Sequence, residues 1–212
     1  MTPIGVSGIV LAGGASSRFG GDKLASQFEG RPLLDRSIDA LAALSSEVVV
    51  VLAPEDDRAL PAKSGSVPVR SVHDPEPHVG PLVGLLAGLE SAREPIVVVA
   101  AGDMPTMSVP VLRALVAALV AAEASADAAV LVLRGVDQPL PAAFRNGATT
   151  QSIRRLIGDG ERSLMSLLRA LPVRRLAEGE WRGLDPEAAT LRDVDRPSDL
   201  YPSRDRTNAP AE

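Results

Sequence analysis

The chain has 212 residues, enough for one domain with a sizeable core, and its formal net charge is −5. The acidic balance argues against nucleic acid as a partner, because binding to a phosphate backbone requires a basic face. Cysteine is absent, which excludes disulfides and thiolate metal sites, and aromatic residues make up 2% of a composition that is 45% hydrophobic. The core must therefore be built from Ala, Val and Leu, as is typical of a parallel sheet covered by helices.

The sequence contains no pattern of a signal peptide or of a membrane span. No Lys or Arg precedes Arg18, and the longest apolar stretches, 96–101 and 114–122, are far shorter than the ~20 residues that cross a bilayer. We therefore expect a cytoplasmic protein with no membrane contact. One domain is expected over residues 1–202, followed by a polar, disordered tail over 203–212.

A glycine-rich loop follows the first expected strand. Gly8–Leu11 is an apolar run typical of a buried strand, and residues 11–23 have the sequence L-A-G-G-A-S-S-R-F-G-G-D-K. Its glycines let the backbone approach an anion closely, and Arg18 and Lys23 add two cations. Open α/β sheets bind ligands at the carboxyl ends of their strands. The pattern favours a phosphate-binding loop over a glycine-rich turn with incidental surface charges.

Two common nucleotide-binding motifs do not fit this loop. A P-loop requires G-x-x-x-x-G-K-[ST], but the glycine that follows Gly14 comes one residue too late and no Lys-Ser or Lys-Thr pair follows it. A dinucleotide fingerprint requires G-x-G-x-x-G, which the adjacent pair Gly13-Gly14 breaks. Ser16 is suited to donate a hydrogen bond to phosphate, since no His or Asp partner for a nucleophilic serine is suggested.

Strands and helices alternate along the next hundred residues. Val48–Leu52 is unbroken and β-branched, which suits a strand buried on both faces. Leu82, Leu85 and Leu89 recur at the spacing of a buried helix face. This alternation predicts an α/β fold. Further strands are expected at 67–72, 96–101 and 128–133, and helices from Pro32, from Pro81, from Ser108 to Glu123, and at 149–157 and 163–171.

The pattern is weaker beyond Gly135. Residues 139–145 are expected to form an edge strand, since proline within sheets is tolerated mostly at edges. Residues 191–197 are expected to be extended, and a short helix is expected from Ser198.

Aspartates near the ends of expected strands are candidates for holding a metal ion. Asp103 follows the apolar run Ile96–Ala101, where a charge is costly unless the site opens to solvent or metal. The alternative role of Asp103 is to cap the following helix. Asp193 and Asp195 lie in D-x-D-x-P and share one face if the segment is extended, so one of them could complete a magnesium site; ordinary turn chemistry is the alternative. Magnesium takes one or two carboxylates plus phosphate oxygens, which suits transfer of a nucleotidyl group.

A proline-rich loop carries a further acidic residue and both histidines. Asp74 is suited either to contact a base or ribose or to be a solvated loop acid. His73 and His78 are five residues apart outside a helix, so they make a poor metal pair.

Three motifs together resemble a known enzyme family. The motif L-A-G-G-x-S-S-R-x-G-x-D-K at 11–23 resembles the signature of nucleotidyltransferases that act on molybdopterin, within the larger group that makes nucleotide sugars. With G-P-L-x-G-L at 80–85 after Asp74, and G-D-M-P at 102–105, the resemblance narrows to the molybdenum cofactor guanylyltransferases and covers most of residues 6–200. It implies a Rossmann-like three-layer sandwich of the nucleotide-diphospho-sugar transferase type, with a mixed, mostly parallel sheet flanked by helices. It also implies transfer of GMP from GTP to the phosphate of molybdenum-bearing molybdopterin, with Mg²⁺ as cofactor and pyrophosphate as product.

The resemblance also implies roles for individual residues. By the family's pattern Leu11–Gly13 and Lys23 meet the nucleotide, Asp74 meets the guanosine part, and Asp103 meets magnesium. The predicted catalytic residues are Arg18, Lys23 and Asp103, and the predicted metal ligands are Asp103 and Asp195. The predicted nucleotide-binding residues are Leu11, Ala12, Gly13, Gly14, Ser16, Lys23, Asp74, Gly80 and Asp103. The expected partners are GTP and the molybdopterin cofactor. Proteins that mature molybdoenzymes are expected as transient partners.

Two departures from the family's pattern concern base specificity. The family often has Asn after the second strand, where this chain has Ala53-Pro54, and its C-terminal motif is commonly N-x-N-x-P, where this chain has D-x-D-x-P, a form closer to the cytidylyltransferases. The alternative functions are a molybdopterin cytidylyltransferase or a sugar-phosphate nucleotidyltransferase. A non-catalytic nucleotide-binding module is the alternative from a different class.

Overall fold

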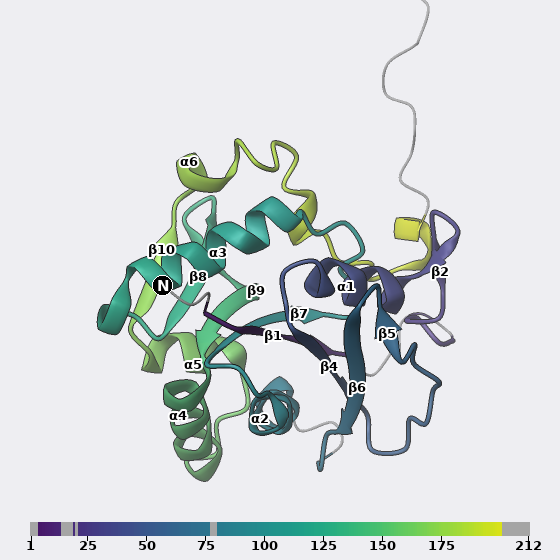
Figure 1. The fold of residues 1–212 in the computed structure, drawn as a ribbon, viewed down its shortest axis with the longest axis horizontal. Helices are drawn as coiled ribbons and strands as arrows, with labels where there is room; N and C mark the ends of the chain where they lie inside the picture. Colours follow the sequence, from purple (N-terminus) through teal and green to yellow (C-terminus); the bar gives the residue numbers. More distant parts are fainter. Residues whose placement is uncertain (1–3, 14–18, 20, 77–79, 201–212) are drawn as a thin grey trace, which may run out of the picture.

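The computed structural model describes residues 4–13, 19, 21–76 and 80–200. A sheet with the strand order β10-β8-β9-β7-β1-β4-β6-β5 forms the middle layer, and helices cover both of its faces (Figure 1). The predicted three-layer α/β architecture with a mixed, mostly parallel sheet is confirmed. The disordered tail predicted over 203–212 lies outside the described residues.

The elements follow one another as the alternating sequence pattern predicts, with several additions. The strands of the main sheet are β1 (Val6–Leu11), β4 (Glu47–Leu52), β5 (Lys63–Ser64), β6 (Val67–His73), β7 (Ile96–Ala101), β8 (Ala128–Leu133), β9 (Val136–Arg145) and β10 (Val173–Leu176), and β2 (Gln27–Phe28) pairs with β3 (Arg31–Pro32) in a separate hairpin. The helices are α1 (Leu33–Ala42), α2 (Pro81–Ser91), α3 (Val109–Ala121), α4 (Asn146–Gly158), α5 (Leu164–Ala170) and α6 (Glu178–Trp181), with short 3₁₀ turns η1 (Glu123–Ser125), η2 (Ala189–Leu191) and η3 (Pro197–Leu200). The hairpin, β5, β10 and α6 were not predicted, and residues 192–196, expected to be extended, form no strand.

The strand directions bring the carboxyl ends of the central strands to the same end of the sheet. Strands β7, β1, β4 and β6 run parallel, and β9 is antiparallel to both β7 and β8. Strands β8 and β10 therefore point the same way as the central strands. The chain passes from β1 to β4 and β6 on one side before it crosses to β7 on the other. The carboxyl ends of β1 and β7 thus flank a topological switch point, where open α/β sheets bind ligands.

The prediction of an edge strand at residues 139–145 is wrong. Strand β9 lies inside the sheet, hydrogen-bonded to β8 on one side and β7 on the other. Its register against β8 shifts, because Ala142 pairs with Val130 whereas Gln138 pairs with Leu131. Both prolines of the segment, Pro139 and Pro141, lie in this irregularity, where their missing N–H groups interrupt no ladder bond.

Two apolar layers hold the sheet between its helices. Val48 and Val50 of β4 point to the face of the sheet that α1, α3 and α6 cover, whereas Val49 and Val51 point to the face that α2, α4 and α5 cover, on the opposite side in Figure 1. Alternate side chains of a strand point to opposite faces, so burial on both faces explains the unbroken valine run. The predicted helix around Pro32 is present as α1, which begins one residue later at Leu33.

A third, smaller apolar cluster ties the C-terminal segment to the hairpin. Phe28, Leu33 and Val194 are buried against one another, and Phe19 and Leu200 pack at the rim. The cluster fixes the irregular D-x-D segment next to the loop that follows β1.

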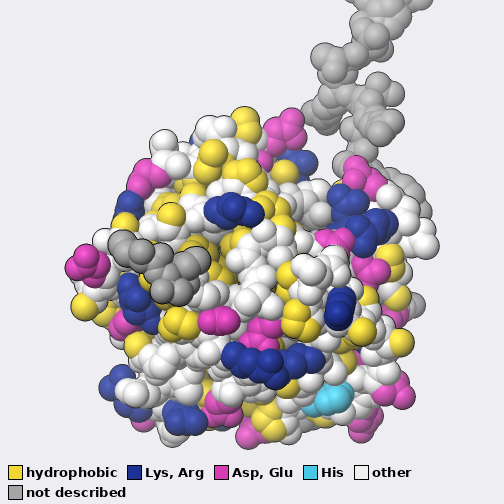
Figure 2. Space-filling model, in the orientation of Figure 1, with side chains coloured by type: hydrophobic (Ala, Val, Ile, Leu, Met, Phe, Trp, Pro, Cys, Tyr) yellow, Lys and Arg dark blue, Asp and Glu magenta, His cyan; other side chains and the backbone are white. Residues whose placement is uncertain are grey.

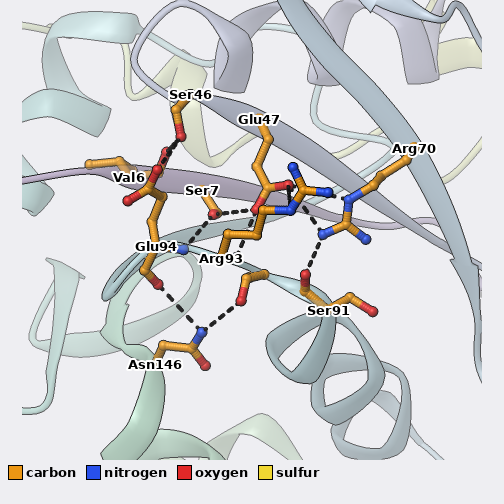
Figure 3. A network of polar contacts seen from close by, with 10 residues as sticks. Val6, Ser7, Ser46, Glu47, Arg70, Ser91, Arg93, Glu94 and Asn146 are labelled. Carbon is orange, nitrogen blue, oxygen red and sulfur yellow. Dashed lines mark hydrogen bonds and ion pairs between the residues drawn. The ribbon is translucent and has the colours of Figure 1, made fainter.

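At the opposite end of the sheet, where β1 and β4 begin, a buried carboxylate forms the centre of a hydrogen-bond network (Figure 3). Glu47 is 4% exposed and accepts hydrogen bonds from Ser7 Oγ at 2.8 Å, from the Arg93 backbone N–H at 2.8 Å and from Arg70 at 3.1 Å. Burial acts to raise the pKa of Glu47, but these donors outweigh it and hold the pKa below its ordinary value. The network joins the amino ends of β1 and β4 and the middle of β6 to the segment before β7.

The surface charge is mixed. On the face seen in Figure 2, the basic side chains of the described residues are interspersed with acidic ones. No helix in the described part of the chain is long and apolar enough to cross a bilayer.

Candidate active site

The start of the glycine-rich loop lies between the ends of β7 and β4. The Gly102 N–H donates to Leu11 O at 2.9 Å, and the Ala12 N–H donates to Val51 O at 2.8 Å. A Cβ at Gly13 would lie 3.5 Å from the backbone N of Ala53, so this segment runs close along the neighbouring strand. The remaining predicted loop residues, Gly14, Ser16 and Arg18, lie outside the described residues.

Three side chains predicted to act together meet at this switch point. The Lys23 ammonium donates to Asp103 Oδ2 at 2.7 Å and to Asp195 Oδ1 at 3.2 Å. The exposed fraction of the side chain is 12% for Lys23, 23% for Asp103 and 59% for Asp195, so the cluster opens to solvent on the Asp195 side. Residues far apart in the sequence therefore converge on one position that holds a positive charge.

The backbone around Lys23 is fixed by a neighbour that sequence reasoning missed. Asp22 Oδ1 accepts the N–H groups of Leu24 at 3.1 Å and Ala25 at 3.3 Å, and it pairs with Arg58 at 3.3 Å. The short-range part of this contact is ordinary turn chemistry that the sequence alone could have suggested. The pairing with Arg58 depends on the fold and has no local signal.

The electrostatics of the cluster keep its lysine charged. Burial acts to lower the pKa of Lys23, but its bonds to Asp103 and Asp195 outweigh burial and raise the pKa above the ordinary value. Burial, followed by repulsion from Asp195, raises the pKa of Asp193. Asp193 is therefore the carboxylate whose ionisation this site disfavours.

The D-x-D segment is positioned by the residue between its two aspartates. The Val194 N–H donates to Asp103 O at 3.0 Å, and the Val194 side chain is buried in the apolar cluster beside the hairpin. The sequence left open which aspartate would approach Asp103. Asp195 shares the Lys23 ammonium with Asp103, although the segment is not the extended strand from which the pairing was predicted.

Two further predicted nucleotide-binding residues are Asp74, which was assigned to the guanosine part, and Gly80. The Asp74 N–H donates to Leu52 O at 2.9 Å, and Asp74 Oδ1 accepts the Glu76 N–H at 3.0 Å. Gly80 precedes α2 with φ of 112°, and a Cβ there would lie 2.8 Å from Arg162 O, so the position requires glycine. His73 Nε2 lies 3.1 Å from the backbone carbonyl oxygen of Asp56, within hydrogen-bond distance. His78 lies outside the described residues.

The donor set fits a magnesium ion that arrives with a nucleotide. Among the described residues, no group of three or more His, Cys, Asp or Glu side chains is arranged to hold a metal by itself. Asp103 and Asp195 nevertheless converge on one cation position, now taken by Lys23. Magnesium commonly takes one or two carboxylates and completes its shell with phosphate oxygens and water.

Comparison with known proteins identifies the family of the chain. Residues 8–176 match the family model described as MobA-like NTP transferase domain. A protein of Chloroflexus aggregans named probable molybdenum cofactor guanylyltransferase is 36% identical over 201 residues, covering 92% of this chain and 91% of the relative. A molybdenum cofactor guanylyltransferase of Desulfosudis oleivorans is 28% identical over 197 residues, covering 92% of each chain.

Solved structures support the fold. Molybdopterin-guanine dinucleotide biosynthesis protein A from Archaeoglobus fulgidus superposes with a TM-score of 0.71 at 24% identity, covering 92% of this chain and 94% of that one. A 4-diphosphocytidyl-2C-methyl-D-erythritol synthase from Anaerococcus prevotii superposes with a TM-score of 0.67 at 14% identity, covering 93% and 95%. The resemblance predicted from the glycine-rich loop is confirmed, and the chain belongs to the MobA-like NTP transferase family.

Proposed function

We propose that this protein is a molybdenum cofactor guanylyltransferase, which transfers GMP from GTP to the terminal phosphate of molybdenum-bearing molybdopterin and releases pyrophosphate. The observation that carries the proposal is the convergence of Lys23, Asp103 and Asp195 at the switch point beside the glycine-rich loop. The relatives named guanylyltransferase, which match over most of their length, support the identity of the two substrates.

The reaction needs positioning and charge neutralisation more than it needs a protein base. A phosphate oxygen of molybdopterin forms a bond to the α-phosphorus of GTP, while the bond from that phosphorus to the oxygen bridging to the β-phosphate breaks. The nucleophile is already an anion, so no side chain has to remove a proton. Lys23 neutralises charge that builds on the α-phosphate and on the departing pyrophosphate, and we assign the same role to Arg18.

Asp103 and Asp195 are the residues that we propose would hold magnesium. The bound ion would offset negative charge on the phosphates of GTP. Lys23 bonds one oxygen of each carboxylate, Asp103 Oδ2 and Asp195 Oδ1, so the second oxygen of each would be open to magnesium. The Lys23 ammonium would then lie beside the phosphates and offset part of their charge.

The nucleotide is proposed to lie across the carboxyl ends of β1 and β4. The backbone of Leu11, Ala12 and Gly13, together with Gly14 and Ser16, would face the phosphates. Asp74 and Gly80 would face the guanosine, where a carboxylate can accept hydrogen bonds from the base or from ribose hydroxyls. GTP as donor implies the cytoplasm as the compartment, and delivery of the product to maturation proteins stays a prediction.

A panel of nucleotides tests the base assignment. We expect GTP with magnesium to raise the melting temperature more than CTP, ATP or UTP does, because only the matched base gains contacts beyond the shared triphosphate. Equal or greater stabilisation by CTP would favour the cytidylyltransferase that the D-x-D-x-P motif suggests. Release of pyrophosphate with GTP, magnesium and molybdopterin separates an enzyme from a module that only binds nucleotide.

A further inference from the structure

Helix α2 contains two buried glycines whose backbones do not require glycine. Gly84 and Gly88 lie inside the helix, and neither has a positive φ. Glycine weakens the interior of a helix relative to alanine, so a reason other than backbone conformation has to account for each. The atoms that crowd the two positions are different in kind.

Gly88 is explained by packing against the sheet. A Cβ at Gly88 would lie 2.9 Å from Ile9 Cγ2 and 3.0 Å from Val51 Cγ2, both on buried strands. These side chains are enclosed in the core and cannot move away without disturbing it. Gly88 therefore allows α2 to approach β1 and β4 closely.

Gly84 is crowded mainly by a carboxylate. A Cβ there would lie 2.9 Å from Asp74 Oδ2 and 3.5 Å from Asp74 Cγ, while its nearest apolar neighbour, Val51 Cγ1, would be at 3.3 Å. Asp74 can rotate about its side-chain bonds, so alanine at this position would displace the carboxylate. Val51 would have to yield by a few tenths of an ångström, a smaller demand on the core than Gly88→Ala makes on Ile9 and Val51. Displacement of the carboxylate would break the hydrogen bond from the Glu76 N–H to Asp74 Oδ1, now 3.0 Å long.

We propose that Gly84 is a positioning residue: because glycine has no side chain, it leaves the space in which the Asp74 carboxylate is held at the end of β6. The main chain of Asp74 is bonded to Leu52 O, the Glu76 N–H holds one carboxylate oxygen, and Gly84 leaves room for the other. This inference rests on the proposed function, in which Asp74 contacts the guanosine part of GTP. Gly84 acts on nucleoside recognition through Asp74 and makes no contact with the phosphates.

The experiment compares Gly84→Ala with Gly88→Ala, the same substitution one helical turn away. Dissociation constants are measured for GTP, CTP and inorganic tripolyphosphate, which has neither base nor ribose, and melting temperatures are measured without ligand. We expect Gly84→Ala to melt closer to the wild-type temperature than Gly88→Ala does and to bind GTP roughly tenfold or more weakly, with unchanged binding of tripolyphosphate. Gly88→Ala should lose melting temperature and keep its affinity for GTP.

A second comparison isolates the path of the effect. In an Asp74→Ala background, Gly84→Ala should cause no further loss of GTP affinity, since the group that it displaces is gone. The inference is refuted if Gly84→Ala binds GTP as the wild type does, if it weakens tripolyphosphate equally, or if its effect persists without Asp74. A wild type that binds GTP no better than CTP refutes the guanine assignment instead, and the nucleotide bound more tightly then replaces GTP in the comparison.

Discussion

Replacement of Lys23 by methionine tests whether this lysine holds the acidic cluster together before a metal nucleotide binds. Methionine keeps the apolar stem of the side chain and removes only its charge and hydrogen bonds. The carboxylates of Asp103 and Asp195 would then lose their shared partner, and Asp193 lies close enough to both to raise the repulsion. The metal-free variant should be less stable than the wild type.

The size of this loss follows from the two ion pairs. The bond from Lys23 to Asp103 is short, at 2.7 Å, and mostly shielded, so it should contribute about 1.5–3 kcal/mol as a hydrogen bond between charged groups. The pair with Asp195, whose side chain is 59% exposed, should add no more than about 1 kcal/mol because solvent screens it. A total near 2 kcal/mol lowers the melting temperature of a domain of this size by about 4–8 °C.

The assay is a thermal melt in chelator, repeated with saturating magnesium and no nucleotide. Magnesium should restore part of the loss in Lys23→Met, because the two carboxylates are free to bind it, and should change the wild type less, because the ammonium competes. The only other lysine of the chain, the exposed Lys63 on β5, supplies the matched control Lys63→Met. Equal melting temperatures of Lys23→Met and wild type in chelator would refute the proposed role.

The other predictions concern the acidic residues. Asp103→Asn should lower pyrophosphate release by orders of magnitude with unchanged circular dichroism, since the substitution keeps size and removes charge; near-normal turnover would remove Asp103 from the metal site. Burial and Asp195 raise the pKa of Asp193, so the folded state holds this proton more tightly and its ionisation costs stability as the pH rises through the folded pKa. Asp193→Asn should therefore melt at or above the wild-type temperature at neutral pH, with the difference fading below about pH 4, and a clear loss at neutral pH would contradict this expectation. The pKa of Glu47 is lowered, so its stabilisation is present above the unfolded value of about 4.3 and is lost as the pH falls through the folded pKa. Melts of Glu47→Gln and wild type should accordingly converge from neutral pH towards about pH 3, and a gap independent of pH would speak against the network in Figure 3.

The sequence predicted the parts of the fold that local patterns specify. The valine run of β4 is buried on both faces, and Pro81 starts α2, because strand period and proline geometry are properties of short segments. The placement of β9 at an edge failed because the general rule for proline overlooked the irregularity between β9 and β8. The rule assumes that a proline inside a sheet costs a hydrogen bond between strands. The register shift between β9 and β8 removes this cost, and it cannot be seen in the sequence of β9 alone.

The sequence predicted which residues form the candidate site but not the hydrogen bonds that join them. Lys23, Asp103 and Asp195 were each singled out, but nothing local indicated that one ammonium would join both carboxylates. The contact depends on Val194, which a small apolar cluster anchors beside the hairpin. The hairpin itself has only two residues in each strand, too few to show a period.

The bond between Lys23 and Asp195 joins residues that are 172 positions apart, and this separation sets an order of events during synthesis. At the usual pace of translation, about 10–30 s pass between the addition of the lysine and the addition of the aspartate. During that interval the glycine-rich loop and the strands that flank it are already on the growing chain, but the second carboxylate of the cluster does not yet exist. The Lys23–Asp195 pair can therefore form only after residue 195 has been added, and a chain interrupted before that residue would carry the glycine-rich loop without the second carboxylate of the cluster.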